Sequence, residues 1–461
     1  MIVTPAKRRP NNILPQRSAA TGTACPAMTL VAVMASAGFL LTILALYPGY
    51  MTNDAGYVHD YIQQWHFGDW QSPLLTLIWW LIDPISPGSG SMFLLTAALY
   101  WAGFVIIALA VARRSHSRSP ARSPIWAIAV LVLALAPPAF MLLAMIWRDI
   151  LFGTVWLLAA AIIYFVADRA GPLRWTAQAL GLVLIGIGIL LRPNAIVAAP
   201  LLIAYAAWPT RMAWKRTALL FIPALFAGYG LIDVVYYRII AAHRDNPLHS
   251  LLVFDLGGIT HFTGENQFPV SWSADKNTLL VTRCYDPARW DSYWTSDLCK
   301  FVMSRLESKD DVVFGTPRLS QAWLRAVAAH PLAYLSHRLT FLWTFLAGSN
   351  RTLELDNLSL PDKTPPARNP YFMTLVAWHD ALKSTALFRP GFWLLFAAAV
   401  GASAWRARMT PSGAFAISVA ASGMVYVLSF AVLGVATDFR YAYWCVLASL
   451  AGLVPALLAR R

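Results

Sequence analysis

The sequence predicts an all-α polytopic membrane protein, and the prediction depends on three observations: composition, long apolar runs, and the placement of basic residues. Of the 461 residues, 58% are hydrophobic and only 13% are charged, and the mean hydropathy is +0.55. These values lie far from those of a soluble chain of this length. The formal net charge of +14 should therefore report loop orientation, and we expect no nucleic-acid partner.

Apolar runs of about twenty residues match the length that a helix needs to cross a hydrocarbon core of roughly 30 Å. Hydropathy predicts about ten transmembrane helices. The first one lacks a small-residue cleavage site and is interpreted as a retained signal anchor. The predicted spans are residues 27–47, 91–112, 125–145, 150–167, 176–191, 195–208, 217–237, 388–404, 412–435 and 441–459.

Lysines and arginines cluster beside alternate ends of these predicted spans. Cytoplasmic loops carry an excess of such residues, so the clusters report sidedness. They are Lys7, Arg8, Arg9 and Arg17; Arg113, Arg114, Arg118 and Arg122; Arg169 and Arg174; Arg211, Lys215 and Arg216; Arg406 and Arg408; and Arg460 and Arg461. All of them fall on one side if both termini are cytoplasmic, and this is the orientation that we predict.

The segment "HPLAYLSHRLTFLWTFLAGS" (330–349) is apolar enough to be mistaken for a further span. Counting it as one would move the later arginine clusters to the opposite side. We therefore interpret it as an amphipathic helix in the outer membrane interface, with His337 and Arg338 toward the headgroups.

This topology divides the chain into four regions. They are a basic cytoplasmic N-terminus (1–26), a transmembrane module (27–237) with an acidic first outer loop (48–90), an extracytoplasmic region (238–387), and C-terminal transmembrane helices (388–461). We expect the extracytoplasmic region to contain a small mixed domain followed by the interfacial helix.

Two cysteines of the extracytoplasmic region, Cys284 and Cys299, lie fifteen residues apart. On the oxidising side of a membrane they are expected to form a disulfide, which for a loop of this size stabilises the fold by about 3 kcal/mol. Two unpaired buried thiols are the alternative.

The first outer loop is acidic and rich in tryptophan. Its sequence "YPGYMTNDAGYVHDYIQQWHFGDWQSPLLTLIWWLID" (47–83) contains four aspartates and no lysine or arginine. Apolar residues at helical spacing predict an amphipathic helix over 55–66. Asp54 is then either the N-cap of that helix or a reactive carboxylate.

Three short turns on the predicted outer side carry the other candidate residues. The turns are "MIWRDILF" with Arg148 and Asp149, "LLRPNAIV" with Arg192 and Asn194, and "ATDFRYAY" with Asp438, Arg440 and Tyr441. Charged residues near the bilayer are costly and usually functional. Local ion pairing, snorkelling and helix initiation are the alternatives for each residue taken singly.

These segments resemble the C superfamily of glycosyltransferases, in particular the bacterial family 39-like membrane enzymes that use polyprenyl-phosphate sugars. "YPGYMTND" is similar to the first-loop motif of the catalytic acid, which places Asp54 at the acid's position. "WRDILF", "RPNAI" and "DFRYAY" resemble the family's second-loop acid motif, a recurrent Arg-x-Asn turn and the C-terminal outer turn, and "HPLAYLSHR" is similar to the helix that follows the family's outer domain. The resemblance covers most of the chain except 240–325. The chain departs from the pattern at Ala55 and at Gln71, which leaves the subfamily and the acceptor open.

The resemblance implies a catalytic role for Asp54 as general base and for Asp149 in orienting the acceptor or Arg148, although the two roles could be exchanged. It implies a polyprenyl-phosphate sugar donor and an envelope glycan or lipid acceptor, such as lipopolysaccharide or O-antigen, at the outer face of the bacterial inner membrane. The remaining expected substrate-binding residues are Arg148, Arg192, Asn194, Arg338, Asp438, Arg440, Tyr441, Asp60 and Trp70.

The physical chemistry fits this expectation. Guanidinium groups present a planar fork to phosphate oxygens and would stabilise the charge of a phosphate leaving group. A loop without cations should leave its carboxylate basic. The tryptophans of the loop, Trp70 among them, either anchor it in the interface or form a wall for the sugar ring.

A phosphomonoester leaving group balanced by arginines needs a metal cofactor less than a diphosphate would. His59, Asp54, Asp60 and Asp149 could nevertheless supply ligands for a divalent metal. Two other classes of function remain open. A transporter or flippase for a lipid-linked or anionic substrate would gather charges at mid-membrane, and a non-catalytic assembly partner would leave the acids and arginines unexplained.

Overall fold

The computed structural model describes residues 24–117, 119–308, 312–348, 352–353 and 369–460. The regular secondary structure of these residues is helical, with three isolated β-bridges outside the helices. The all-α prediction is confirmed. Most of the predicted cytoplasmic N-terminus, Arg118 and Arg461 lie outside the described residues.

Within the described residues, seven helices are long and apolar enough to cross a membrane. They are α1 (Ala24–Leu46), α4 (Ser89–His116), α7 (Arg148–Val166), α8 (Pro172–Leu191), α10 (Trp214–Ile232) with its continuation η5 (Asp233–Ile239), α19 (Pro411–Leu433), and α20 (Tyr443–Ala459) preceded by η9 (Phe439–Ala442). A bent pair, Pro120–Leu133 with Pro137–Ala144, turns by 57° and forms either a broken eighth span or a re-entrant loop. The chain is therefore a multi-pass membrane protein.

Two of the ten predicted spans are too short in the structure, so the predicted number was wrong. The segment 195–208 forms part of η4 (Pro193–Val197) and then α9 (Ala199–Ala207), whose nine residues rise only about 13 Å. The segment 388–404 forms α18 (Pro390–Ala404), whose fifteen residues rise about 22 Å. Hydropathy counts apolar residues but does not show where prolines and turns interrupt the helix.

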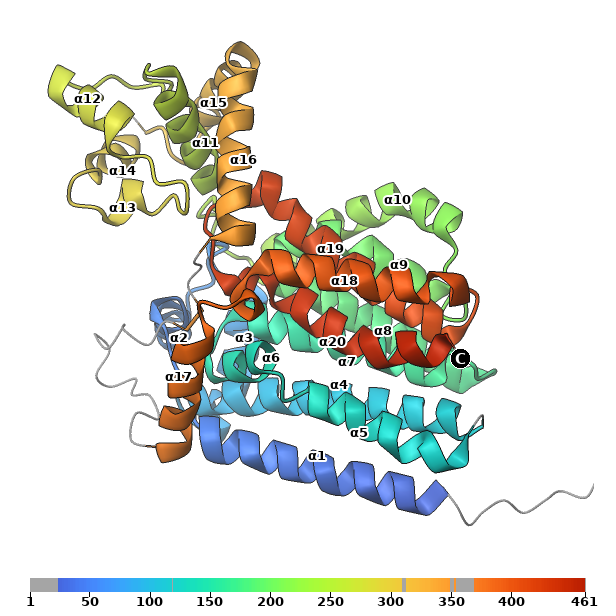
Figure 1. The fold of residues 1–461 in the computed structure, drawn as a ribbon. Coiled ribbons are helices and arrows are strands. Elements are labelled where there is room, and N and C mark those ends of the chain that lie inside the picture. Colours follow the sequence, from blue (N-terminus) through green and yellow to red (C-terminus); the bar gives the residue numbers. More distant parts are fainter. Residues whose placement is uncertain (1–23, 118, 309–311, 349–351, 354–368, 461) are drawn as a thin grey trace, which may run out of the picture.

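The helices form a bundle in which α1 begins, and α20 ends, at the same end (right in Figure 1). We call this the basic end, because Arg113, Arg114 and Arg460 lie there. The opposite end, which we call the loop end, carries α2 (Asn53–Gln64), α3 (Pro73–Ile82) and α17 (Pro370–Leu382). The core of the bundle is α7 and α20, whose apolar windows are both 83% buried.

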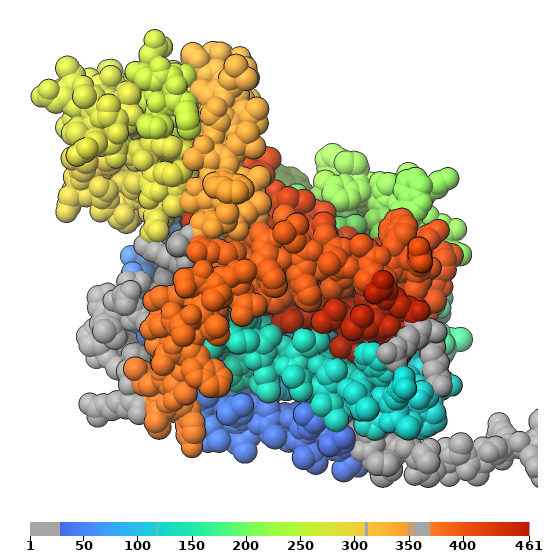
Figure 2. Space-filling model, in the orientation of Figure 1, coloured from blue at the N-terminus to red at the C-terminus, as the bar shows by residue number. Residues whose placement is uncertain are grey.

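Six helices form a lobe that projects from the loop end, which we call the appendage (yellow to orange in Figure 2). They are α11 (Leu248–Thr263), α12 (Ala274–Thr282), α13 (Ser292–Thr295), α14 (Phe301–Leu306), α15 (Pro317–Ala329) and α16 (Pro331–Ala347). Its described residues contain no strand, so the predicted mixed domain was wrong. Composition rich in Asp, Asn, Pro and Ser does not distinguish short helices from strands.

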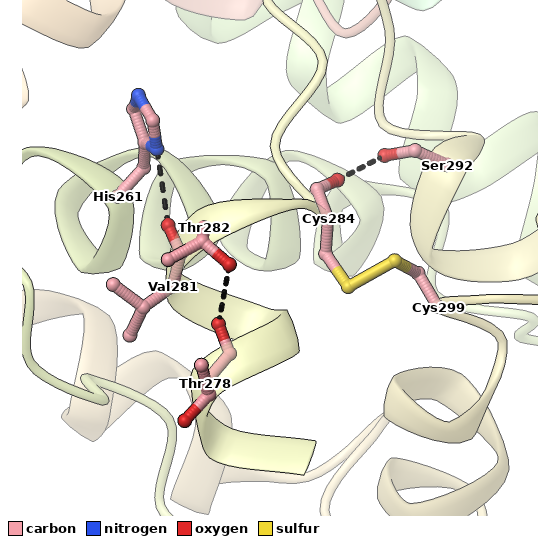
Figure 3. The surroundings of a disulfide bond; sticks show 7 residues. All are labelled: His261, Thr278, Val281, Thr282, Cys284, Ser292 and Cys299. Atoms are coloured by element: carbon pink, nitrogen blue, oxygen red, sulfur yellow. Dashed lines mark hydrogen bonds between the residues drawn. A yellow bond between two sulfur atoms is a disulfide. The ribbon is translucent and has the colours of Figure 1, made fainter. Parts of the chain in front are cut away.

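The predicted disulfide is present in the appendage. Cys284 follows α12 and Cys299 precedes α14, and their sulfurs are bonded (Figure 3). The hydroxyl of Ser292 donates a hydrogen bond of 2.8 Å to the carbonyl of Cys284. The bridge joins two segments that have little regular structure between them.

Helix α16 is not a span and runs across the bundle axis, as Figure 1 shows. Its orientation about its own axis differs from the prediction, however. His337 is 0% exposed and Arg338 is 5% exposed, and both face Asp255 of α11. The exposed face carries Leu332, Leu335, Leu339 and Trp343. The apolar side of this helix, not its polar side, is available to the membrane interface.

Candidate functional site

Four separate turns of the chain meet at the loop end. They are the first turn of α2 with Asp54, the start of α7 with Arg148 and Asp149, the turn after α8 with Arg192, and the turn before α20 with Asp438, Arg440 and Tyr441. Thr52, in extended conformation, is the N-cap of α2, so Asp54 lies inside the first turn and is not the cap. An acidic residue is favourable there because of the helix dipole.

The first ion pair joins α7 to the turn after α8. The Nε of Arg192 lies 3.0 Å from an oxygen of Asp149, and the two side chains are only 9% and 3% exposed. The same Nε donates to the hydroxyl of Tyr426 at 3.4 Å. Near the end of α8, Gly188 lets this helix pack closely against α7, because a Cβ at that position would lie 2.0 Å from the indole nitrogen of Trp156.

In the second set of ion pairs, Arg440 bridges the carboxylates of Asp54 and Asp438. Nη1 of Arg440 lies 2.7 Å from Asp54, and Nη2 lies 2.9 Å from Asp438. The guanidinium is 4.6 Å from the ring centroid of Trp147, which precedes α7. Arg440 is 9% exposed and Asp438 is 12% exposed, whereas Asp54 is 45% exposed.

One aromatic ring connects the two pairs. The ring of Tyr441 lies 4.9 Å from the guanidinium of Arg192 and 5.3 Å from that of Arg440. Contacts of this geometry are attractive because the ring face is electron-rich. The two arginines are therefore held at fixed positions beside each other, although their like charges repel.

Arg148 is the third arginine of the cluster. Its Nη1 donates a hydrogen bond of 3.2 Å to the carbonyl of Trp70 in the first loop. It lines a pocket at the loop end together with Asp54, Gln71, Trp79, Trp147 and Arg440. The cavity volume is about 10 Å³, roughly the space of one water molecule. A larger ligand enters only if the lining elements move apart.

The charge environment of Asp54 differs from the prediction. Burial raises the pKa of its carboxyl, but the charges of Arg440, Arg148 and Arg192 and the hydrogen bond from Arg440 outweigh burial, so that the pKa lies below its usual value. The prediction of an undisturbed basic carboxylate was wrong. The loop itself has no cation, but the turns that fold against it supply three.

Four other residues that we expected in the site have the following surroundings. Asn194 is half-buried in η4, Asp60 is exposed on α2, and the ring of Trp70 contacts Trp290 of the appendage at 5.8 Å. Arg338 pairs with Asp255 and donates a hydrogen bond of 2.7 Å to the carbonyl of Gly434. This arginine connects the appendage to the end of α19, and we leave it out of the site.

The residues that could have supplied metal ligands do not gather. Asp54 and Asp149 pair with arginines, and the Nε2 of His59 lies 3.6 Å from Asp83. Across the described parts of the chain, no group of three or more histidine, cysteine or acidic side chains is placed to hold a metal ion.

Sequence reasoning missed Tyr426 and Trp147, which contact the two arginines. Tyr426 lies inside α19 and is 1% exposed, and Trp147 donates a hydrogen bond of 2.8 Å to the hydroxyl of Thr52. The only signal in the sequence was a polar aromatic residue within or beside an apolar run, which is common in membrane helices.

Comparison with known proteins gives little further information. No protein-family model matches the chain, and no curated protein matches it significantly. Among solved structures, it is similar to the archaeal oligosaccharyltransferase AglB from Archaeoglobus fulgidus, in complex with an inhibitory peptide and a dolichol-phosphate. The TM-score is 0.39 at 13% identity, and the match covers 94% of this chain but only 50% of that one. A likeness at this score carries no argument about function, which has to come from the site itself.

Proposed function

We propose that the chain is a membrane glycosyltransferase that moves a sugar from a polyprenyl-phosphate carrier to an acceptor hydroxyl at the loop end of the bundle. The observation that carries this proposal is the convergence of Asp54, Asp149, Arg192 and Arg440, from four turns far apart in the sequence, on one small region. Such turns need no charges in order to fold.

The arginines suit the phosphate of a lipid carrier. That phosphate lies at headgroup level, where the ends of transmembrane helices also lie, and its oxygens accept bidentate hydrogen bonds from guanidinium groups. Arg440 and Arg148 both line the pocket, and Arg192 lies beside Arg440 across the ring of Tyr441. Three cations fixed before the reaction would stabilise the charge that develops on the leaving phosphate.

The carboxylate of Asp54 is the proposed general base. The acceptor oxygen forms a bond to the anomeric carbon of the sugar while the bond from that carbon to the phosphate oxygen breaks. The hydroxyl proton passes to Asp54, and the polyprenyl phosphate leaves with the bonding electrons. A positioned base typically contributes 10²–10⁴-fold in rate. Asp149 is buried against Arg192 and orients the guanidinium of that arginine.

The proposed orientation places the loop end outside the cytoplasmic membrane of a bacterium, and both termini inside. The clusters of arginine at the basic end support it, as does the disulfide between Cys284 and Cys299, which forms in oxidising compartments. A lipopolysaccharide, O-antigen or other surface glycan would then be the acceptor.

A transporter or flippase fits the charges less well. Transporters bind their substrates near mid-membrane between broken helices. Here Asp54, Arg192 and Arg440 lie at one end of the bundle, in turns or in the first turn of a helix.

Comparative mass spectrometry of envelope glycans tests the proposal. Cells with and without the gene should differ by one hexose, pentose or amino-sugar mass, restored by the wild-type gene but not by an Asp54→Asn gene. Identical glycans in all strains would overturn the proposal. The missing mass also identifies the donor for assays with purified protein.

A further inference from the structure

Asp54 differs from the other carboxylates of the cluster in exposure. It is 45% exposed, whereas Asp438 is 12% and Asp149 is 3% exposed. It is also the only one of the three carried by a helix of the first loop, α2. Breaking a buried pair leaves an uncompensated buried charge, so Asp54 is the carboxylate that can leave its arginine at the lowest cost.

The charges of the cluster balance as they stand. Three arginines, Arg148, Arg192 and Arg440, face three aspartates. Both terminal nitrogens of Arg440 are used, one on Asp54 and one on Asp438. A phosphate that entered without releasing a carboxylate would add negative charge to a neutral cluster and would find both terminal nitrogens of Arg440 already paired.

The pocket as it stands is also too small for a phosphate. Asp54, Arg148 and Arg440 all line it, and the cavity volume is about 10 Å³, which is room for about one water molecule. An anion that binds the Nη1 of Arg440 would need the position that the Asp54 carboxylate now occupies.

We propose that Asp54 acts as an internal substitute for the donor's phosphate on Arg440, and that the arriving polyprenyl phosphate displaces it. This inference rests on the proposed function and adds an order of events, in which the donor phosphate binds first and thereby releases the base. The phosphate takes the Nη1 edge of Arg440, and α2 carries the released carboxylate toward the solvent-exposed side, where the acceptor hydroxyl would approach. No covalent bond changes in this exchange of ion pairs.

Activation of the base then follows from donor binding. Away from Arg440 the carboxylate loses the charge and the hydrogen bond of that arginine, both of which lower its pKa, so it becomes a better proton acceptor. Coupling between two binding events is reciprocal: if the phosphate loosens Asp54 from Arg440, then Asp54 must weaken the binding of the phosphate. This reciprocity makes the proposal measurable without any turnover.

The experiment measures the affinity of purified full-length protein in detergent for a polyprenyl phosphate that carries no sugar, undecaprenyl phosphate. Wild type is compared with Asp54→Asn and with Asp54→Ser, a second neutral variant in case the first folds poorly. Arg440→Gln removes the proposed phosphate contact. Asp297→Asn is the charge-matched control, because Asp297 is 96% exposed in the appendage and pairs only locally with Lys300. Thermal melting of every variant checks folding.

We expect both Asp54 variants to bind undecaprenyl phosphate more tightly than wild type, within the 5–150-fold range typical of coupled sites. Asp297→Asn should match wild type, and Arg440→Gln should lose most of the affinity. If folded Asp54 variants bind equally or more weakly than wild type, the inference is overturned and the proposed function stands. If no folded protein binds the lipid phosphate, the proposed function fails as well.

Discussion

The guanidinium of Arg440 lies 2.7 Å from the carboxylate of Asp54, so an ion pair joins the turn before the last helix to the first loop. The other nitrogen edge of Arg440 holds Asp438 at 2.9 Å. This arrangement needs a planar group with two parallel edges. Arg440 therefore contacts the proposed base, Asp54, and is also the proposed contact for the donor phosphate.

Replacing Arg440 by lysine should reduce sugar transfer by more than about tenfold, because an ammonium keeps the charge but loses the planar fork. The measurement is the initial rate of transfer by purified protein with the donor identified from the envelope comparison. Arg238→Lys is the matched control, since Arg238 is 73% exposed and pairs with Asp233 on its own helix. Equal rates for Arg440→Lys and wild type would mean that the fork has no catalytic importance.

Breaking the buried pair of Arg192 and Asp149 should cost stability as well as activity. Arg192→Ala leaves a carboxylate that is 3% exposed without its partner, which typically costs about 3–5 kcal/mol. We expect a lower melting temperature and weaker donor binding. Asp149→Asn should lower turnover less than Asp54→Asn does.

A double variant, Arg192→Leu with Asp149→Leu, separates the two effects. Replacement of both charges by apolar groups often restores stability, so its melting temperature should approach that of wild type while donor binding stays weak. Donor binding as strong as that of wild type in this variant would mean that the pair is structural only.

The disulfide should stabilise the appendage. A closed loop of 15 residues between Cys284 and Cys299 contributes about 3 kcal/mol. Reductant should therefore lower the protease resistance of the appendage in wild type. It should have no effect on the variant with both cysteines replaced by serine, which should be cleaved readily from the start. Unchanged resistance of wild type in reductant would show that packing alone holds the appendage.

The orientation can be tested by labelling single cysteines in a Cys25→Ser background. Ile85 lies at the loop end and is 76% exposed, and Ser117 lies exposed after α4 at the basic end. An impermeant maleimide added to intact spheroplasts should label Ile85→Cys and not Ser117→Cys. Labelling of Ser117→Cys alone would reverse the orientation and place the site in the cytoplasm.

The membrane class and the helical fold could be predicted because they depend on composition and on run length, which any window of sequence reports. The number of spans could not. Residues 195–208 are apolar enough, but η4 begins at Pro193 and α9 ends at Ala207, before Pro209. Hydropathy also gave the wrong face of α16, because His337 and Arg338 are polar but find a buried partner in Asp255.

The site, too, could be predicted only in part. Turns that carry charges beside apolar helices gave Asp54, Asp149, Arg192 and Arg440 as candidates. Their pairing depends on which turns the folded bundle brings together, and nothing local in the sequence encodes that Arg440 reaches Asp54. The lowered pKa of Asp54 follows from this pairing, so it could not be predicted from the sequence either.

The rate of sugar transfer by purified Asp54→Asn decides whether the carboxylate of Asp54 is the general base. Asn has nearly the shape of Asp but cannot accept the proton, and the N-cap position of α2 is held by Thr52 and not by Asp54, so the helix should persist. Transfer should fall by about 10²–10⁴-fold, while the variant still binds undecaprenyl phosphate and melts as a folded protein. Near-normal transfer by Asp54→Asn would contradict the account, because the first-loop carboxylate would then not be the base.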